Sequence, residues 1–215
     1  MDILLDETEI RVLGCLLEKE MATPEYYPLS LNALVNACNQ KSNREPVVSY
    51  DETTVMRAVQ SLKDKRFARQ SDASRVPKYE QNFSKSKNML RKEAALLCLL
   101  LLRGAQTVGE LRGRSDRLYE FADLADVERT LDNLIDMEFV VRLPRQPGRK
   151  ESRFAHLLGG EVQMVDDYHE AVESDSGNRG RGKDRITALE EEIAGIRTEL
   201  NGLKETFENF KKQFE

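Results

Sequence analysis

The sequence predicts a mainly helical α+β protein with small β-hairpins, made of two tandem winged-helix domains and a C-terminal coiled-coil helix. Three features predict this class: an internal repeat, short strands after the third helix of each copy, and a heptad pattern of apolar residues near the C-terminus. The expected divisions are a first winged-helix domain over residues 1–84, a second over 85–165, a flexible linker over 166–185 and a coiled-coil helix over 186–215.

The internal repeat is clearest in the third helix of each copy. Residues 55–62 (VMRAVQSL) align without gaps on residues 127–134 (VERTLDNL), 72 residues further along the chain. Residues 30–34 (SLNAL) align on residues 107–111 (TVGEL) with an offset of 77 residues. Self-similarity of this kind indicates two copies of one structural unit.

The helices are predicted from capping signals and from apolar periodicity. Three pairs have the spacing of a capping box, in which each side chain satisfies the backbone N–H of the other residue: Asp6 with Glu9, Ser49 with Glu52, and Thr107 with Glu110. Apolar residues then recur at helical spacing within both copies: Ile10, Leu13, Leu16 and Leu17; Val55, Val59 and Leu62; Leu124, Val127, Leu131, Leu134 and Ile135.

Two strands are expected after the third helix of each copy. The first pair covers residues 66–70 and 78–83, and the second covers 139–143 and 152–157. The turn over residues 144–148 contains Pro and Gly, which favour a hairpin between β-branched and aromatic segments. Three helices closed by a β-hairpin is the winged-helix plan; the alternative is an α-helical repeat without strands.

The C-terminal residues predict a linker and a dimerising helix. Residues 171–184 hold almost no apolar side chains, which is typical of a flexible linker. From residue 186 apolar residues alternate in steps of three and four, as in a coiled coil: Ile186, Leu189, Ile193, Ile196, Leu200, Leu203, Phe207, Phe210 and Phe214. The pairing of Glu192 with Arg197 and of Glu199 with Lys204 across two chains favours a parallel homodimer. The alternative is that this stripe docks on the chain's own body or on a foreign helix.

Composition and charge restrict the class of protein. The 215 residues carry a net charge of −5 at pH 7, with no Trp and 7% aromatic residues, which disfavours a carbohydrate or base-stacking platform. No apolar run reaches the roughly 18 residues of a membrane helix and no secretion signal is present, so we expect a cytoplasmic protein without membrane contact. Cys15, Cys38 and Cys98 lie within apolar helical patterns and are expected to be buried free thiols.

No pattern of catalytic or metal-binding residues is present. The histidines are His156 and His169, and neither has a second ligand at metal-binding spacing. No phosphate-binding loop, dinucleotide fingerprint or nucleophile elbow occurs. We therefore expect a protein that is not an enzyme and uses no metal or cofactor, with His156 a surface or half-buried side chain of the last strand.

Basic and polar residues suggest a double-stranded DNA interface. We expect the third helix of the first copy to read bases, while the preceding loop and the second wing contact phosphates. The candidate residues are Lys41, Arg44, Thr53, Thr54, Arg57, Gln60, Lys63, Arg142, Arg145, Arg149, Lys150 and Arg153. Arg112, Arg114 and Arg117 add positive charge after the second helix of the second copy. The third helix of that copy argues against DNA because its outward positions are acidic: Asp126, Glu128, Asp132 and Asp136.

Four segments carry a family resemblance: residues 27–46, 101–112, 119–121 and 140–153. Through them residues 6–160 resemble the YceH-like family of uncharacterised bacterial proteins, which has a similar coiled-coil ending. The resemblance implies tandem winged helices, and it carries over no catalytic residue.

Two functions remain open at this point. One is a dimeric winged-helix DNA-binding protein that acts as a transcriptional regulator and recognises paired half-sites. The other is a non-enzymatic scaffold whose tandem winged helices bind partner proteins, which the acidic helix over residues 124–137 and the pI of about 5.4 favour. A single positive face across both copies would favour DNA.

Overall fold

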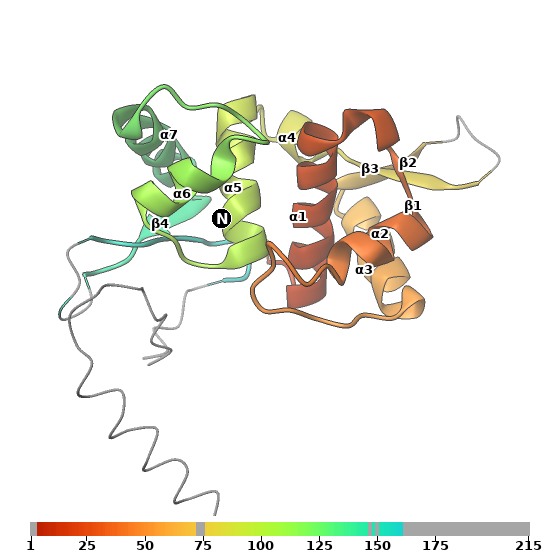
Figure 1. The fold of residues 1–215 in the computed structure, drawn as a ribbon. Helices are drawn as coiled ribbons and strands as arrows, with labels where there is room; N and C mark the ends of the chain where they lie inside the picture. The colour runs from red at the N-terminus through yellow and green to blue at the C-terminus, as the bar shows by residue number, and fades with distance from the viewer. Residues whose placement is uncertain (1–3, 72–75, 146–147, 149–150, 161–215) are drawn as a thin grey trace, which may run out of the picture. The chain divides into compact units, whose positions relative to one another are not determined.

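In the computed structural model, two similar groups of elements follow one another along the chain, and each ends in antiparallel strands (Figure 1). The structure describes residues 4–71, 76–145, 148 and 151–160. The first group is α1 (Glu7–Ala22), η1 (Pro24–Tyr26), β1 (Leu29–Ser30), α2 (Leu31–Cys38), α3 (Glu52–Asp64), β2 (Ala68–Ser71) and β3 (Lys78–Gln81). The second, after the short helix α4 (Phe83–Ser86), is α5 (Arg91–Arg103), α6 (Val108–Ser115), α7 (Leu124–Asp136), β4 (Val140–Arg142) and β5 (Phe154–His156). The α+β class is therefore confirmed.

The repeat extends from the sequence into the backbone. α7 begins and ends 72 residues after α3, and α6 begins and ends 77 residues after α2. Arg66 and Glu138, which follow α3 and α7 at that same offset of 72, both leave the helix with positive φ, 61° and 60°. Phe67 and Phe139 come next and turn into the core, where the ring of Phe83 packs edge-on against both, at 5.0 and 5.5 Å between centroids. The short helix α4 therefore supplies one aromatic side chain that holds both copies.

The capping signals gave two correct helix starts and one wrong one. The boxes formed by Asp6 with Glu9 and by Thr107 with Glu110 are present as predicted. The predicted box of Ser49 with Glu52 is wrong, because Asp51 is the N-cap of α3 and accepts the N–H of Thr54 at 2.7 Å. A carboxylate directly before the helix reaches this N–H, and Ser49 lies two residues too early. Asp123 caps α7 in the same way.

The hairpins confirm that this is not a purely helical repeat. β2 pairs with β3, with Arg69 opposite Glu80, and β4 pairs with β5, with Val141 opposite Ala155. All four strands are shorter than the sequence predicted. The sequence did not predict β1, which adds to β3 and makes the first sheet three-stranded in the order β1-β3-β2. Two residues are too few to produce a visible alternation of apolar and polar positions.

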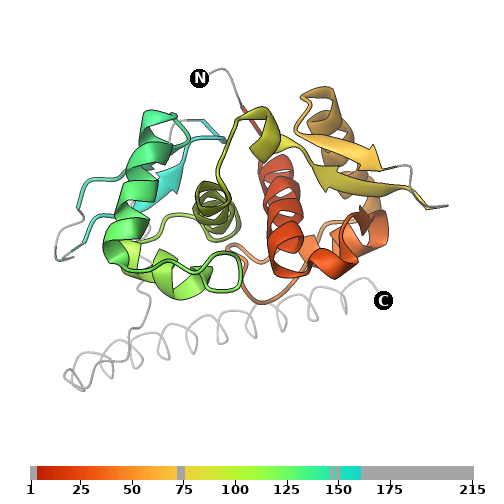
Figure 2. The ribbon, with the colours of Figure 1, turned by 90° about the horizontal axis from the view of Figure 1, so that it is seen from above.

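A single hydrophobic core connects the two copies. α1 and α5 pack side by side at its centre (Figure 2). Gly14 makes this close approach possible, since a Cβ atom at that position would stand 2.8 Å from Cδ2 of Leu102 and 3.3 Å from Cβ of Leu101. All the described residues belong to one compact unit, which ends at residue 164. The division into a domain over 1–84 and a domain over 85–165 stays a prediction.

The three cysteines are free and buried, as predicted. Cys98 lies where α5 meets α1, and its thiol donates to the backbone oxygen of Gly14 at 3.4 Å. Burial raises the pKa of the Cys98 thiol well above its usual value, because the thiolate would be desolvated. This thiol is therefore a packing group of the α1–α5 contact.

His156 gives the fold an expected dependence on pH. The side chain is half-buried, its Nδ1 has no hydrogen-bond partner among the residues that the structure describes, and burial lowers its pKa to about 4. The unfolded chain, with an imidazole pKa of about 6.5, binds the proton more tightly, so stability present above pH ~6.5 is lost as the pH falls toward 4. Between pH 7 and 5 we expect the free energy of unfolding to drop by about 2 kcal/mol through this residue. Urea titrations at both pH values, compared with those of His156→Gln, measure this, and an equal drop in the variant would contradict it.

Several predictions fall outside the described residues. They are the linker over 166–185, the coiled-coil helix over 186–215 and the dimerisation residues Ile186, Leu189, Ile193, Ile196, Leu200, Leu203, Phe207, Phe210 and Phe214. The basic residues Arg149 and Lys150 of the second wing fall there too.

Candidate functional site

α3 carries the predicted base-reading side chains on its solvent face. Val55, Ala58, Val59 and Leu62 fix the opposite face in the core. Thr53, Arg57 and Gln60 are exposed, whereas Thr54 and Lys63 are half-buried. Along this face Lys63 donates to the side-chain oxygen of Gln60 at 3.4 Å, and the Gln60 amide donates to Asp64 at 2.9 Å. The face therefore offers one arginine, an amide and hydroxyls on a rigid helix.

α7, at the matching place in the second copy, presents an acidic face. Arg129 and Asp132 occupy the positions 72 residues after Arg57 and Gln60. Asp132 is exposed, as are Glu128 and Asp136, while Arg129 is paired with Asp126 at 3.6 Å. Exposed carboxylates repel a DNA backbone, and the expectation that α7 does not read DNA stays a prediction.

The basic residues of the second hairpin are partly neutralised. Arg142 pairs with Asp132 at 3.7 Å and covers the ring of Phe154, and Arg153 pairs with Glu110 at 3.3 Å. Arg145 is exposed. In Figures 1 and 2, α3 and β4 lie at opposite sides of the described unit. The structure does not bring the predicted wing residues together with the face of α3.

Arg44 is a structural residue and not a surface cation, which corrects the sequence-based expectation. Its side chain is 4% exposed. The guanidinium donates to both carboxylate oxygens of Glu18, at 3.1 and 2.6 Å, and to the backbone oxygen of Ala37. Because these donors are already used inside the protein, Arg44 cannot reach a phosphate without local unfolding.

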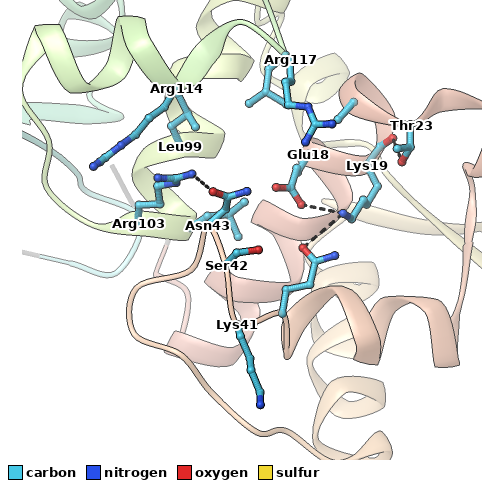
Figure 3. Close-up of a pocket in the computed structure, with 14 residues that line it drawn as sticks. Glu18, Lys19, Thr23, Lys41, Ser42, Asn43, Leu99, Arg103, Arg114 and Arg117 are labelled. Atoms are coloured by element: carbon cyan, nitrogen blue, oxygen red, sulfur yellow. Dashed lines mark hydrogen bonds and ion pairs between the residues drawn. The ribbon is translucent and has the colours of Figure 1, made fainter.

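A basic cleft of about 460 Å³ lies where the two copies meet (Figure 3). It is formed by the C-terminal parts of α1 and α5, the loop after α2, and the end of α6 with the residues that follow it. Its lining residues are Glu18, Lys19, Ala22, Thr23, Gln40, Lys41, Ser42, Asn43, Leu99, Leu102, Arg103, Arg114, Arg117 and Leu118. Five of these side chains are cationic and Glu18 is the one carboxylate among them.

The sequence did not predict this cleft. Lys41 is the one predicted DNA-contact residue that lines it. The sequence placed Arg114 and Arg117 after the second helix of the second copy, but Arg114 lies within α6 and Arg117 follows it. Nothing local in the sequence shows that this end of α6 lines a cleft together with the end of α1. A second, shallower groove of about 260 Å³ lies between α6, α7 and the second hairpin, with Leu124, Phe154 and Arg142 among its lining residues.

Metal-binding clusters and membrane-spanning helices are both absent from the part of the chain that the structure describes. Within residues 4–71, 76–145, 148 and 151–160, no group of three or more His, Cys, Asp or Glu side chains is placed to hold a metal ion. Over the same ranges, no helix has the length and apolar character that crossing a membrane requires.

Comparison with known proteins places the chain in a family. The family model described as "Protein of unknown function, DUF480" matches residues 5–149. A UPF0502 protein of Solibacter usitatus is 53% identical over an alignment of 217 positions that covers the whole of both chains. UPF0502 proteins of Geobacter sulfurreducens and Pelobacter propionicus are 51% and 50% identical, again over both full lengths. These matches agree with the resemblance found in the sequence, and the chain belongs to the UPF0502 family of bacterial proteins, whose shared domain is DUF480.

Proposed function

We propose that this protein is a non-enzymatic, winged-helix DNA-binding protein in which α3 reads the major groove. The observation that carries the proposal is the solvent face of α3, where Thr53, Arg57 and Gln60 project from a helix fixed by its buried side. Arg pairs with guanine and Gln with adenine through two hydrogen bonds each, which makes them suitable base-reading residues.

The order of elements supports this interpretation. Each copy runs helix, helix, helix, strand, strand, with a short extended segment before the second helix. In proteins with a helix-turn-helix arrangement, the helix in the place of α3 enters the major groove with its N-terminal part leading. The N-cap of α3 is acidic, so contact by its first turn is unfavourable and the middle of the helix carries the readout.

The quaternary arrangement belongs to the same proposal. Pairing of residues 186–215 as a parallel coiled coil would present two α3 helices to paired half-sites on cytoplasmic DNA. A transcriptional regulator is the role that this arrangement fits best, because two-fold readers recognise palindromic operators.

A protein-binding scaffold is the second candidate, and the acidic face of α7 favours it. Glu128, Asp132 and Asp136 are exposed there, and Leu124 at the start of the helix is 51% exposed. An apolar residue beside an acidic face suits a basic amphipathic partner. Under this alternative α7, rather than α3, would carry the contact.

The repeat provides matched variants that test α3 against α7. We expect Arg57→Ala to weaken binding to a sequence enriched by unbiased DNA selection about tenfold, since a bidentate base contact contributes about 1–3 kcal/mol. Gln60→Ala should relax the preference at a different base pair. Fluorescence anisotropy of the full chain with the selected and with scrambled duplexes measures both effects.

Arg129→Ala is the control, because it removes the same charge at the equivalent position of α7. Its affinity for the selected duplex should equal that of the unmodified chain. Equal losses in Arg57→Ala and Arg129→Ala, or a selection that enriches no sequence, would show that α3 reads no bases. Co-purification of a partner that Asp132→Lys abolishes, together with no DNA enrichment, would favour the scaffold.

A further inference from the structure

The basic cleft carries more positive charge than its neighbours neutralise. Glu18 is already used by Arg44, at 2.6 Å, and by Lys19, at 3.3 Å. Arg103 donates to the side-chain oxygen of Asn43 and to no carboxylate in the described part of the chain. Lys41 and Arg117 have no ion pair or hydrogen bond within the described residues. Arg103 and Arg117 therefore border one concave space without a carboxylate partner among the described residues, whereas the ammonium group of Lys41, which also lines the cleft, points away from both in Figure 3.

The charges around Arg103 are mostly positive. Burial is the largest cause that lowers the pKa of its guanidinium, and repulsion from Arg114 and Arg44 lowers it further, while Glu18 alone acts in the other direction. Arginine side chains normally lie where an opposite charge favours their ionised form. An anion in the cleft would remove this repulsion.

These cations do not act as ordinary helix caps. Basic residues near helix C-termini often donate to the last free carbonyl groups. Arg112, which does not line the cleft, donates to the backbone oxygens of Phe121 and Ala122 in the loop before α7. In contrast, Lys19, Arg103 and Arg114 donate only to side chains within the described residues, and Figure 3 shows Lys19 and Arg103 among the side chains that line the cleft.

The floor of the cleft is apolar, which strengthens charge interactions above it. Leu99, Leu102 and Leu118 are each at most 6% exposed and form this floor with Ala22. A low-dielectric wall beside clustered charges focuses the field into the concave space. Thr23, Ser42 and Gln40 add hydroxyl and amide groups for directional hydrogen bonds. The cleft volume is within the range of roughly 300–1,000 Å³ that is typical of small-molecule sites.

We propose that this cleft binds a small molecule carrying two phosphate groups, held by Arg103 and Arg117. A phosphate group carries a charge of roughly −1.5 to −2 at pH 7, so two groups exceed the charge of the two arginines, and Lys19, which also lines the cleft, adds positive charge. Arg114, at the rim, adds to the field and is partly compensated by Glu110 at 3.6 Å. The proposal does not depend on DNA binding by α3, because the two sites share no side chain.

Inorganic pyrophosphate is the probe that tests this site. We expect the full chain to bind it with one site per chain in isothermal titration calorimetry at constant ionic strength, and more tightly than orthophosphate. Arg117→Ala should weaken this binding about tenfold, since it removes a charge-assisted hydrogen bond to the ligand. Arg117 is exposed and unpaired, so this variant should keep the fold and the stability of the unmodified chain.

Arg129→Ala serves as the matched control, because Arg129 is an exposed arginine on α7 outside the cleft. Its pyrophosphate affinity should be unchanged. The proposal is overturned if the unmodified chain shows no saturable binding, if orthophosphate binds equally well, or if Arg117→Ala and Arg129→Ala behave alike. Loss of duplex DNA binding in Arg117→Ala without any pyrophosphate binding would also overturn it and would assign the cleft to the DNA surface.

Discussion

Replacing Gly14 by leucine is expected to lower the free energy of unfolding by about 3 kcal/mol, because it forces the two central helices apart. A Cβ atom at Gly14 would lie 2.8 Å from Cδ2 and 3.0 Å from Cγ of Leu102, which is 2% exposed. Leu102 could move only by pushing on other core residues, since protein interiors are close-packed. A leucine side chain adds three further carbon atoms beyond Cβ, and a close-packed core has no space for them.

The measurement is equilibrium unfolding in urea, followed by circular dichroism at pH 7. Gly113→Leu is the matched control, because Gly113 also lies within a helix but a Cβ atom there would meet nothing within 4 Å. That control should gain up to about 1 kcal/mol from the better helix propensity of leucine. Gly14→Leu as stable as the unmodified chain would mean that α1 and α5 do not pack as closely as described.

Gly14 also illustrates what the sequence could not predict. Within α1 a glycine indicates only a cost in helix propensity. A glycine is needed at this position because of the close contact with Leu102 on α5, which belongs to the other copy of the repeat. The burial of Arg44 against Glu18 and the cleft beside them depend in the same way on contacts between distant segments.

Features that depend on residues close together in the sequence were predicted better than those that depend on distant contacts, and the reason is physical. The capping boxes at Asp6 and Thr107 join residues three positions apart, so both partners are visible in the sequence. The hairpins followed from the 72-residue repeat, because copies with the same pattern of apolar residues bury it in the same way. The prediction of Ser49 as the N-cap of α3 was wrong, and Asp51 is the cap. Both residues have side chains suited to capping, so the sequence alone does not show at which of them the backbone enters the helix.

Replacing Arg44 by alanine is expected to destabilise the fold by about 3–5 kcal/mol, because it leaves a largely buried carboxylate without its main partner. The guanidinium now joins Glu18 to the backbone oxygen of Ala37 and to the side-chain oxygen of Gln40, so the variant also leaves acceptors on two segments unsatisfied. Arg44→Lys should recover only part of the loss, since an ammonium group cannot form the two parallel hydrogen bonds to the carboxylate.

The same pair makes a testable contribution to acid stability. Burial raises the pKa of Glu18, but the hydrogen bonds and charge of Arg44 outweigh it, so that the pKa lies below its usual value. A carboxyl group with a lowered pKa in the folded state stabilises the protein above its unfolded pKa of about 4.3 and loses this effect as the pH falls through the folded value. Urea unfolding at pH 7 and pH 3 should therefore show a smaller acid loss in Arg44→Ala than in the unmodified chain.

Arg57→Ala separates the two roles that the sequence assigned to these arginines. Arg57 is exposed on α3, so its removal should change stability by less than about 0.5 kcal/mol while it weakens DNA binding. Arg44→Ala should do the reverse: among molecules that remain folded, as monitored by circular dichroism, affinity for the selected duplex should be unchanged. A loss of affinity in folded Arg44→Ala as large as in Arg57→Ala would mean that the guanidinium leaves Glu18 when DNA binds. The buried pair would then be a resting arrangement that opens on contact with phosphate.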